Sequence, residues 1–268
     1  MDNKAISLDS TPRSSPLVPR SDTSRGPRAA GGLTVKAISL DIWGTLLRSD
    51  PAFKPARNDM LRRALAPEIG ADEFNRVMRE CDREADEISM GRGTDVGFAE
   101  RVELTLAALG SAIALTPADV DRLMHAQAEL ARAHHPLPLD ERLPDLVAEL
   151  AETRPVVLTS NTGMLPGVLM RDLLALAGFH GKLGMVFSNE VGWAKPDPRI
   201  FETAITLVEG TAGEPIASSC VVHVGDNAVA DEQGARAAGM TTVLVRPDGK
   251  STVDALEHAR RGLSLIHI

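Results

Sequence analysis

The sequence is poor in cysteine, with only Cys81 and Cys220 among its 268 residues. Each lies in a segment whose local pattern predicts a buried helix or strand. Small secreted domains that rely on disulfides need more cysteines than this. The sequence therefore indicates a reduced compartment, and we expect a cytoplasmic protein.

Long apolar runs and excess positive charge are also missing. No run approaches the ~20 residues of a membrane-spanning helix, and the N-terminus lacks the continuous hydrophobic core of a secretory signal. The formal net charge is −8, whereas a nucleic-acid or acidic-membrane surface needs clustered Lys and Arg. We expect a soluble, non-exported protein with no nucleic-acid or membrane partner. Small anionic substrates remain compatible through local cations.

What is present is typical of a globular enzyme, with 43% apolar and 25% charged residues. Residues 1–33 differ, because they mix Ser, Pro, Arg and Gly without any period, which predicts a disordered tail. Lys4 to Asp9 reads KAISLD, as do Lys36 to Asp41. The first copy lacks the WGTL that follows the second, so we interpret it as inert.

Residues 49–138 show helical periodicity. The clearest helix start is Thr116 to Asp119, which offers a capping hydroxyl, a first-turn proline and an acidic third position. A block of this length without a convincing strand is too long for a single crossover between parallel strands. We therefore predict a separate helical cap domain at 49–138, inserted into a core formed by 34–48 and 139–268.

The core alternates apolar strand patterns with helical patterns. Strands are expected at 35–40, 155–159, 184–187, 220–224 and 241–245. Helices are expected between them at 143–152, 164–177, 198–208 and 229–238. This alternation predicts an α/β fold with a doubly wound, parallel, Rossmann-like sheet, in which the first strand is central.

Polar residues follow the predicted strands or lie in the loops between them. They are Asp41, Thr45, Ser160, Asn161, Lys195, Asp226 and Asp231. Each of these residues, taken alone, is also typical of a turn or a helix cap. Ligands of parallel sheets bind outside the carboxyl ends of the strands. We therefore expect a site at this edge, with chemistry that starts at Asp41.

Four short motifs occur in order: DIWGT from Asp41, Ser160-Asn161, Lys195-Pro196-Asp197, and Gly225-Asp226 followed by Asp231. Together they resemble the haloacid dehalogenase (HAD) superfamily of hydrolases, whose motifs are Asp-x-x-Gly-Thr, Ser/Thr-Asn, Lys-Pro-Asp and Gly-Asp-x4-Asp. The resemblance covers residues 34–48 and 139–247, and the helical block lies where many members carry a cap.

The resemblance implies roles for these residues. Asp41 would be the nucleophile of a covalent aspartyl intermediate that water then hydrolyses. Mg²⁺ would be held by Asp41, Asp226 and the main-chain carbonyl of Trp43, with Lys195 opposite. Phosphoryl oxygens would be bound by Thr45, Ser160 and the N–H of Asn161. Asp231 would hydrogen-bond Lys195 or a metal-bound water.

Trp43 departs from the family pattern. The family's phosphatases carry at this position a second aspartate, which protonates the leaving oxygen, and indole cannot replace it. A positioned general acid contributes ~10²–10⁴-fold. The substrate of a phosphohydrolase would then need a good leaving group, as in an acyl phosphate or anhydride, or an acid from the cap. Candidates for that acid are His125, His134, His135, Asp95 and Glu100.

The main hypothesis is a Mg²⁺-dependent phosphohydrolase acting on a small phosphorylated metabolite. One alternative is a weak or inactive regulatory protein that binds phosphate and metal. Another is a metal-independent 2-haloacid dehalogenase, since those family members carry an aromatic residue at the position of Trp43. They also replace the Gly-Asp loop, which Asp226 retains here, and place a tyrosine where Phe201 stands. This sequence has no tyrosine.

Substrate choice in this family depends on the cap. The run Phe53 to Arg57 places two cations where an anionic substrate tail could pass, although a solvated helix start is equally compatible. The glycine-containing stretch 90–94 is either a specificity loop or a connector. Trp193 either lines the substrate pocket or only packs against neighbouring side chains.

Overall fold

A five-stranded parallel sheet forms the centre of the fold in the computed structural model, which describes residues 34–261. Its strands are β1 (Ala37–Leu40), β4 (Val156–Ser160), β5 (Leu183–Phe187), β6 (Val221–Gly225) and β7 (Thr241–Leu244). The order is β5-β4-β1-β6-β7, with Ile38 opposite Val156 on one side and Val222 on the other. The prediction of a parallel sheet with a central first strand is confirmed. The predicted tail and the first KAISLD copy lie outside the described residues.

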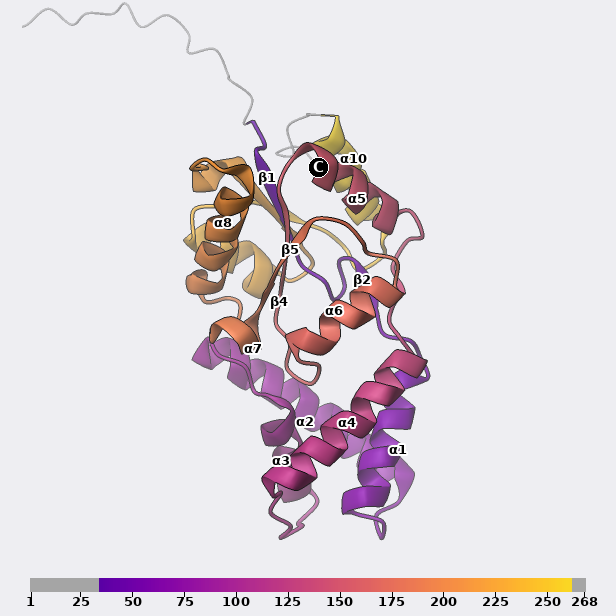
Figure 1. Ribbon diagram of the computed structural model, residues 1–268. Helices are drawn as coiled ribbons and strands as arrows, with labels where there is room; N and C mark the ends of the chain where they lie inside the picture. The colour runs from indigo at the N-terminus through magenta and orange to yellow at the C-terminus, as the bar shows by residue number, and fades with distance from the viewer. Residues whose placement is uncertain (1–33, 262–268) are drawn as a thin grey trace, which may run out of the picture. The chain divides into compact units, whose positions relative to one another are not determined.

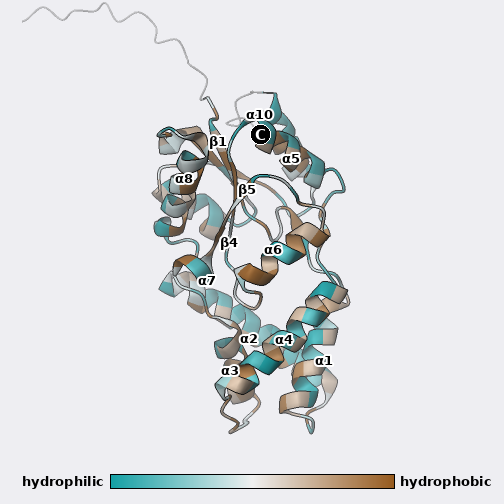
Figure 2. Ribbon diagram, viewed as in Figure 1, coloured by the Kyte–Doolittle hydropathy of each residue, from teal (hydrophilic) through white to brown (hydrophobic). Residues whose placement is uncertain are grey.

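Helices cover both faces of the sheet, which is why every residue of β1 is buried. On one face, α5 (Leu143–Thr153), α6 (Gly167–Leu176) and α10 (Lys250–Arg260) pack against a cluster that contains Ile38 and Leu40. On the other face, α8 (Pro198–Ala212) and α9 (Gly234–Ala237) pack against a cluster that contains Ala37 and Val157. The strands are accordingly mostly brown in Figure 2. The α/β class is confirmed.

Four helices separate β1 from the rest of the sheet. They are α1 (Phe53–Leu65), α2 (Ala71–Arg92), α3 (Phe98–Ala108) and α4 (Pro117–Ala133), and we call them the helical insertion. They share an apolar cluster of their own, with Leu61, Phe74 and Leu106 inside it. Two short strands flank the insertion, β2 (Leu47–Arg48) and β3 (Leu137–Pro138), and pair antiparallel.

Local signals explain several helix ends. At the start of α4, Thr116 Oγ1 accepts from the Asp119 N–H at 3.2 Å, and Asp119 Oδ2 accepts from the Thr116 N–H at 3.2 Å. The predicted N-terminal capping of this helix by Thr116 and Asp119 is therefore confirmed. The helix expected at 229–238 is instead a π-helical turn, Ala228–Gln233, followed by α9. Asn227 caps this turn, and its side-chain oxygen accepts from two successive N–H groups at 2.9 Å each.

Three smaller differences from the sequence-based expectations remain. α10 and the short helix α7 (Ser188–Val191) were not predicted. Cys220 ends a 3₁₀ turn and is half-buried rather than part of a buried strand, whereas Cys81 is buried on α2 as expected. Among residues 34–261, no helix combines the length and the apolar character that crossing a bilayer requires.

Candidate active site

Asp41 follows the last residue of β1 and lies at the carboxyl edge of the sheet. Its N–H donates to the Val224 carbonyl of β6 at 2.9 Å, and the residue is only 5% exposed. The chain then turns at Gly44, which has φ +80°. A Cβ at Gly44 would overlap the Asp226 carboxylate. Glycine at this position therefore permits both the left-handed turn and the approach of a second carboxylate.

Lys195 is buried between two carboxylates. Its Nζ lies 2.5 Å from Asp41 Oδ1 and 2.6 Å from Asp231 Oδ1. Asn161 holds the backbone of this lysine on both sides, because its Oδ1 accepts from the Lys195 N–H at 2.7 Å and its Nδ2 donates to the Lys195 carbonyl at 3.0 Å. The second motif thus fixes the position of the cation in the third.

Burial and charge pairing set the protonation states of these groups. Burial raises the pKa of Asp41 to about 7, although the Lys195 charge acts in the opposite direction. For Asp231, burial favours a higher pKa, but Lys195 and the His223 hydrogen bond outweigh it and lower the pKa. Burial also opposes the charge of Lys195, and the two carboxylates outweigh it and raise that pKa. Lys195 is therefore a permanently charged cation in a water-excluded position.

A buried chain of polar side chains supports Asp231 from inside the sheet. His223 on β6 places Nε2 3.2 Å from Asp231 Oδ1 and Nδ1 2.8 Å from Ser39 Oγ, and Ser39 Oγ lies 3.0 Å from Thr159 Oγ1. Burial lowers the pKa of His223. In the neutral ring, Nε2–H donates to the carboxylate and Nδ1 accepts from Ser39. Sequence analysis missed this support, although polar residues inside a doubly covered strand signal a buried hydrogen-bond network.

Three carboxylates could hold a metal ion: oxygens of Asp41, Asp226 and Asp231 lie within 4.8 Å of one another. Asp231 already uses both of its oxygens, one for Lys195 and His223 and the other for the Asn227 N–H at 2.9 Å. In the part of the chain that the structure describes, no side-chain hydrogen bond or ion pair involves Asp226. Burial and the Asp231 charge raise the pKa of Asp226. This donor set fits a hard, oxygen-liganded cation such as Mg²⁺.

The predicted phosphate-binding residues occupy two different positions. Ser160 lines the cavity beside Asp41, and its hydroxyl donates to the Asn161 carbonyl at 3.1 Å. Thr45 is fully buried and does not line the cavity. Its hydroxyl instead donates to Asp41 Oδ2 at 3.1 Å. Thr45 therefore orients the Asp41 carboxylate in this structure.

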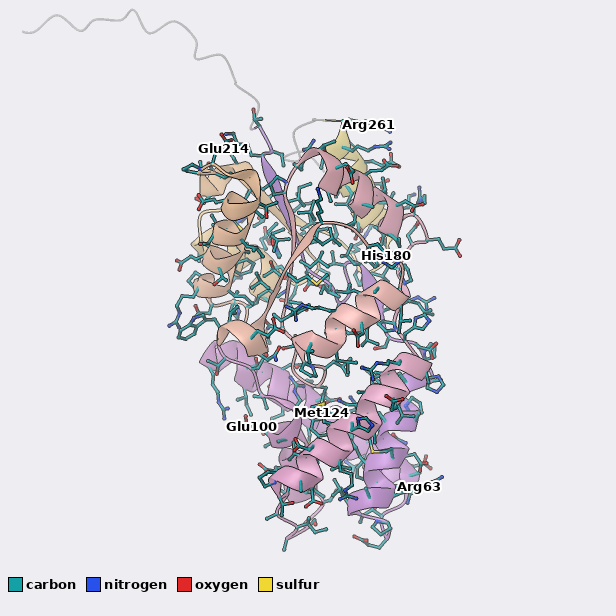
Figure 3. The ribbon with its side chains drawn as sticks, in the orientation of Figure 1. Arg63, Glu100, Met124, His180, Glu214 and Arg261 are labelled. Atoms are coloured by element: carbon teal, nitrogen blue, oxygen red, sulfur yellow. The ribbon has the colours of Figure 1, made fainter. Side chains whose placement is uncertain are left out.

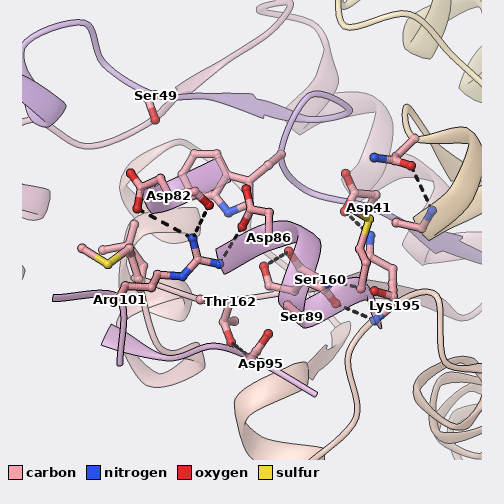
Figure 4. Close-up of a pocket in the computed structure, with 18 of the residues that line it drawn as sticks. Asp41, Ser49, Asp82, Asp86, Ser89, Asp95, Arg101, Ser160, Thr162 and Lys195 are labelled. Carbon is pink, nitrogen blue, oxygen red and sulfur yellow. Dashed lines mark hydrogen bonds and ion pairs between the residues drawn. The ribbon is translucent and has the colours of Figure 1, made fainter. Parts of the chain in front are cut away.

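A cavity of about 430 Å³ opens between the sheet edge and the helical insertion. Figure 4 shows Asp41 and Lys195 at one end of this cavity and Asp82 and Arg101 at the other. On the sheet side it is lined by Asp41, Trp43, Ser160, Asn161, Lys195, Asp226 and Asp231, among others. From the insertion come Phe53, Lys54, Arg57, Asp82, Asp86, Ser89, Met90, Asp95 and Arg101. The structure thus brings all the predicted site residues except Thr45 to one cavity wall.

The loop between α2 and α3 binds the sheet region next to the site. Asp95 Oδ2 accepts from the hydroxyls of Thr162 at 2.9 Å and Ser188 at 2.5 Å. The Gly93 carbonyl accepts from the Ala194 N–H at 2.8 Å, directly before Lys195. These contacts fasten the insertion to the loops that carry the second and third motifs. Residues 90–92 belong to α2, so only 93–97 form the connecting loop.

Of the five acid candidates in the insertion, only Asp95 lines the cavity. His125 is exposed, and Glu100 pairs with Arg92 at 2.7 Å on the insertion (Figure 3). His135 Nδ1 lies 3.1 Å from the Pro136 carbonyl. Trp193 also lies outside the cavity wall, where the Arg199 guanidinium stacks 3.2 Å from its ring centre.

Comparison with known proteins agrees with this fold and motif order. The family model "haloacid dehalogenase-like hydrolase" matches residues 35–239. The haloacid dehalogenase-like hydrolase domain-containing protein 3 of Homo sapiens is 43% identical over 77 residues, which are 26% of this chain and only 28% of that protein. A glyceraldehyde 3-phosphate phosphatase of Methanopyrus kandleri is 26% identical over 214 residues, 79% of this chain and 84% of that protein.

Solved structures share the fold. The HAD-hydrolase YfnB of Bacillus subtilis matches with a TM-score of 0.57 at 17% identity, covering 80% of this chain and 90% of that one. The defluorinating L-2-haloacid dehalogenase Rha0230 matches with a TM-score of 0.54 at 19% identity, covering 81% and 84%. These identities support the fold alone, whereas the family model spans most of the sequence. The chain belongs to the haloacid dehalogenase-like hydrolases.

Proposed function

We propose that this hydrolase is a Mg²⁺-dependent phosphohydrolase that acts on a small phosphorylated metabolite. The observation that carries the proposal is the convergence of Asp41, Lys195 and Asp226 on one cavity, where the Asp226 carboxylate lies beside that of Asp41. Similarity to phosphatases supports it: besides the Methanopyrus protein, a phosphoserine phosphatase of Thermus thermophilus is 40% identical over 105 residues, 38% of this chain and 39% of that protein.

In the proposed mechanism, a carboxylate oxygen of Asp41 attacks phosphorus and the bond to the leaving oxygen breaks. Water then attacks the acyl phosphate, which releases inorganic phosphate and restores Asp41. Thr45 and Lys195 hold the attacking carboxylate in one orientation. Ser160 and the N–H of Asn161 bind phosphoryl oxygens, and Asp231 positions Lys195.

The side chains of Asp41 and Asp226 and the carbonyl of Trp43 would hold the metal. Mg²⁺ supplies, when bound, the positive charge that a dianionic phosphoryl group needs beside three carboxylates. We further propose that residues 49–138 act as a cap on a core of 34–48 and 139–268. An apolar cluster built mainly from the insertion helices, and the β2–β3 pair at the two ends of the insertion, support this division.

Trp43 keeps a second function open, a phosphate- and metal-binding regulatory protein with little turnover. It lines the cavity, but its indole N–H is not acidic enough to protonate a leaving alkoxide. Substrates with good leaving groups, such as acyl phosphates and anhydrides, are therefore the first to test. The Asp226 carboxylate beside Asp41 speaks against the metal-independent dehalogenase.

The test is phosphate and halide release by the purified protein, in parallel with Mg²⁺ and with EDTA. Substrates are acyl phosphates, anhydrides, alkyl phosphates and 2-haloacids. Phosphate release that EDTA abolishes is the expected result. Halide release that is insensitive to EDTA would establish a dehalogenase. Absence of turnover on every substrate, with Mg²⁺ bound, would favour the regulatory function.

A further inference from the structure

Helix α2 presents a polar stripe to the cavity. Asp82, Asp86 and Ser89 are spaced four and three residues apart, so they share one face of the helix, and all three line the cavity. In Figure 4 they lie on the insertion side, with Arg101 beside Asp82 and Asp86. They are therefore placed to contact whatever part of a substrate extends away from Asp41.

The buried charges of this wall are already paired. Arg57 Nη2 lies 3.1 Å from Asp82 Oδ2, and Arg101 Nη2 lies 2.6 Å from Asp86 Oδ1. Arg101 also donates from Nε to the Val96 carbonyl at 2.7 Å and from Nη1 to the Asp82 carbonyl at 3.1 Å. Both guanidinium groups are therefore already engaged. An anionic substrate tail, which the cations of the Phe53 to Arg57 run suggested, would find no free buried cation on this wall. The remaining cation, Lys54, is exposed.

Two buried polar atoms of the same stripe are unpaired. Ser89 is only 3% exposed and its Oγ has no hydrogen-bond partner among residues 34–261, nor has Asp82 Oδ1. Arg101 Nη1 is 3.7 Å from Asp82 Oδ1, too far for a hydrogen bond. Buried polar atoms are nearly always satisfied in folded proteins. A carboxylate oxygen can only accept, so the missing partner at Asp82 is a donor.

We infer that the part of the substrate beyond its phosphoryl group is neutral and polyhydroxylated, and that Ser89 and Asp82 are specificity-determining residues that bind its hydroxyls. This inference rests on the proposed phosphohydrolase function. An anionic group would face Asp82 and Asp86, while both buried guanidinium groups are already paired. An ammonium could donate to Asp82 Oδ1 but could not accept from the Ser89 hydroxyl, whereas hydroxyls both donate and accept and so satisfy both unpaired atoms. The cavity of about 430 Å³ suits a small ligand.

The test is binding rather than turnover, so that it does not depend on the missing acid. Calorimetry with Asp41→Asn and Mg²⁺ compares glycerol 3-phosphate with four probes: ethyl phosphate, phosphoethanolamine, 3-phosphoglycerate and inorganic phosphate. We expect glycerol 3-phosphate to bind about 10-fold more tightly than ethyl phosphate, since two further hydrogen bonds form. The two charged esters should bind less tightly than glycerol 3-phosphate, because an ammonium cannot accept from Ser89 and a carboxylate is repelled by Asp82.

Adding Ser89→Ala to the Asp41→Asn protein should reduce the 10-fold preference for glycerol 3-phosphate over ethyl phosphate to about 3-fold. The substitution removes an unpaired hydroxyl and leaves no protein group without a partner, so the fold should keep its thermal stability. Ser111→Ala, on the insertion but outside the cavity wall, is the matched control and should keep the full preference.

Equal binding of all the esters, or tighter binding of phosphoethanolamine or 3-phosphoglycerate, would overturn the inference while the proposed function stands. An unchanged preference in Ser89→Ala would remove Ser89 from it. Because Asp41 is a proposed metal ligand, inorganic phosphate is also titrated into the wild-type protein with Mg²⁺. If phosphate does not bind there, the proposed function itself fails, and this inference fails with it.

Discussion

The sheet wall and the insertion wall of the cavity bury charge in different ways. On the sheet wall, Lys195 is shared by Asp41 and Asp231, and both oxygens of Asp231 are occupied. On the insertion wall, Asp82 and Ser89 each retain a buried polar atom without a partner. The network of Asp41, Lys195 and Asp231 fixes these groups in advance, which is what electrostatic catalysis requires. The unpaired atoms of the insertion wall can instead form hydrogen bonds to a ligand, and that suits recognition.

The largest effect should come from removing the nucleophile on the sheet wall. Asp41→Asn keeps the size of the side chain and an oxygen acceptor for Lys195, so the fold should persist, but phosphate release should fall by at least about 10³-fold. Initial rates with Mg²⁺ measure this, with circular dichroism as the check on the fold. Full activity in the variant would rule out the covalent mechanism.

Removing the shared cation should cost stability as well as activity. Lys195→Met leaves two buried carboxylates without their counter-charge, which typically costs about 3–5 kcal/mol in the free energy of unfolding. Urea denaturation measures the loss. Lys36→Met is the matched control, because its partner Glu214 and the lysine itself are 62% and 46% exposed, and it should change stability by less than about 1 kcal/mol. If Lys195→Met lowers the free energy of unfolding by less than about 1 kcal/mol, the sheet wall tolerates unpaired charge.

Substitutions at Trp43 test whether the sheet wall lacks only a general acid. Trp43→Asp should raise kcat on ethyl phosphate by about 10²-fold, the lower end of the range for a positioned acid. Trp43→Asn opens the same space without a proton to donate, and should give no such gain. If both variants gain equally, space rather than acidity was limiting. No gain in either, with Mg²⁺ binding preserved, would mean that another residue supplies the proton.

Asp95 joins the two walls, and its role can be separated from acid catalysis. Asp95→Ala loses the contacts to Thr162 and Ser188, so the loop between α2 and α3 should be held less firmly beside the site. KM should rise about 10–100-fold, as expected for a charged hydrogen bond. The value of kcat should change little. A fall in kcat of about 10²-fold at unchanged KM would identify Asp95 as the missing acid instead. Asp95→Asn keeps one acceptor, so its KM should lie between those of the wild-type protein and Asp95→Ala.

The sheet wall could be predicted from sequence because its residues follow strands in short motifs with their own turn signals. Asp41 precedes a glycine turn, Lys195 precedes a proline, and Asp226 follows an apolar strand. Each position is fixed by local backbone structure and by the meeting of strand ends at one edge. Such features are encoded within a few residues.

The insertion wall could not be predicted in the same way. Helix α2 is charged on several faces, so the stripe of Asp82, Asp86 and Ser89 looks like any solvated helix surface. Arg101 was missed for the same reason, since its pairing with Asp86 depends on how α2 and α3 pack. Tertiary packing, not local sequence, decides which polar face meets the cavity.

His223 offers the smallest and most selective test of the completed network. Burial lowers its pKa below the ordinary value of 6.5, so the unfolded chain binds a proton that the folded protein does not. Stability should therefore be lost as pH falls below about 6.5, by at most about 1.4 kcal/mol per pH unit from this group. Asp41 acts with the opposite sign, because its raised pKa stabilises the folded state as pH falls from 7 toward 4.

Comparing the wild-type protein with His223→Gln removes the Asp41 contribution, which both proteins share. The amide of glutamine can still donate to Asp231 but does not titrate. Between pH 7 and 5.5, the free energy of unfolding of the wild-type protein should therefore fall relative to that of the variant. Parallel curves would show that burial does not hold His223 neutral in the folded protein.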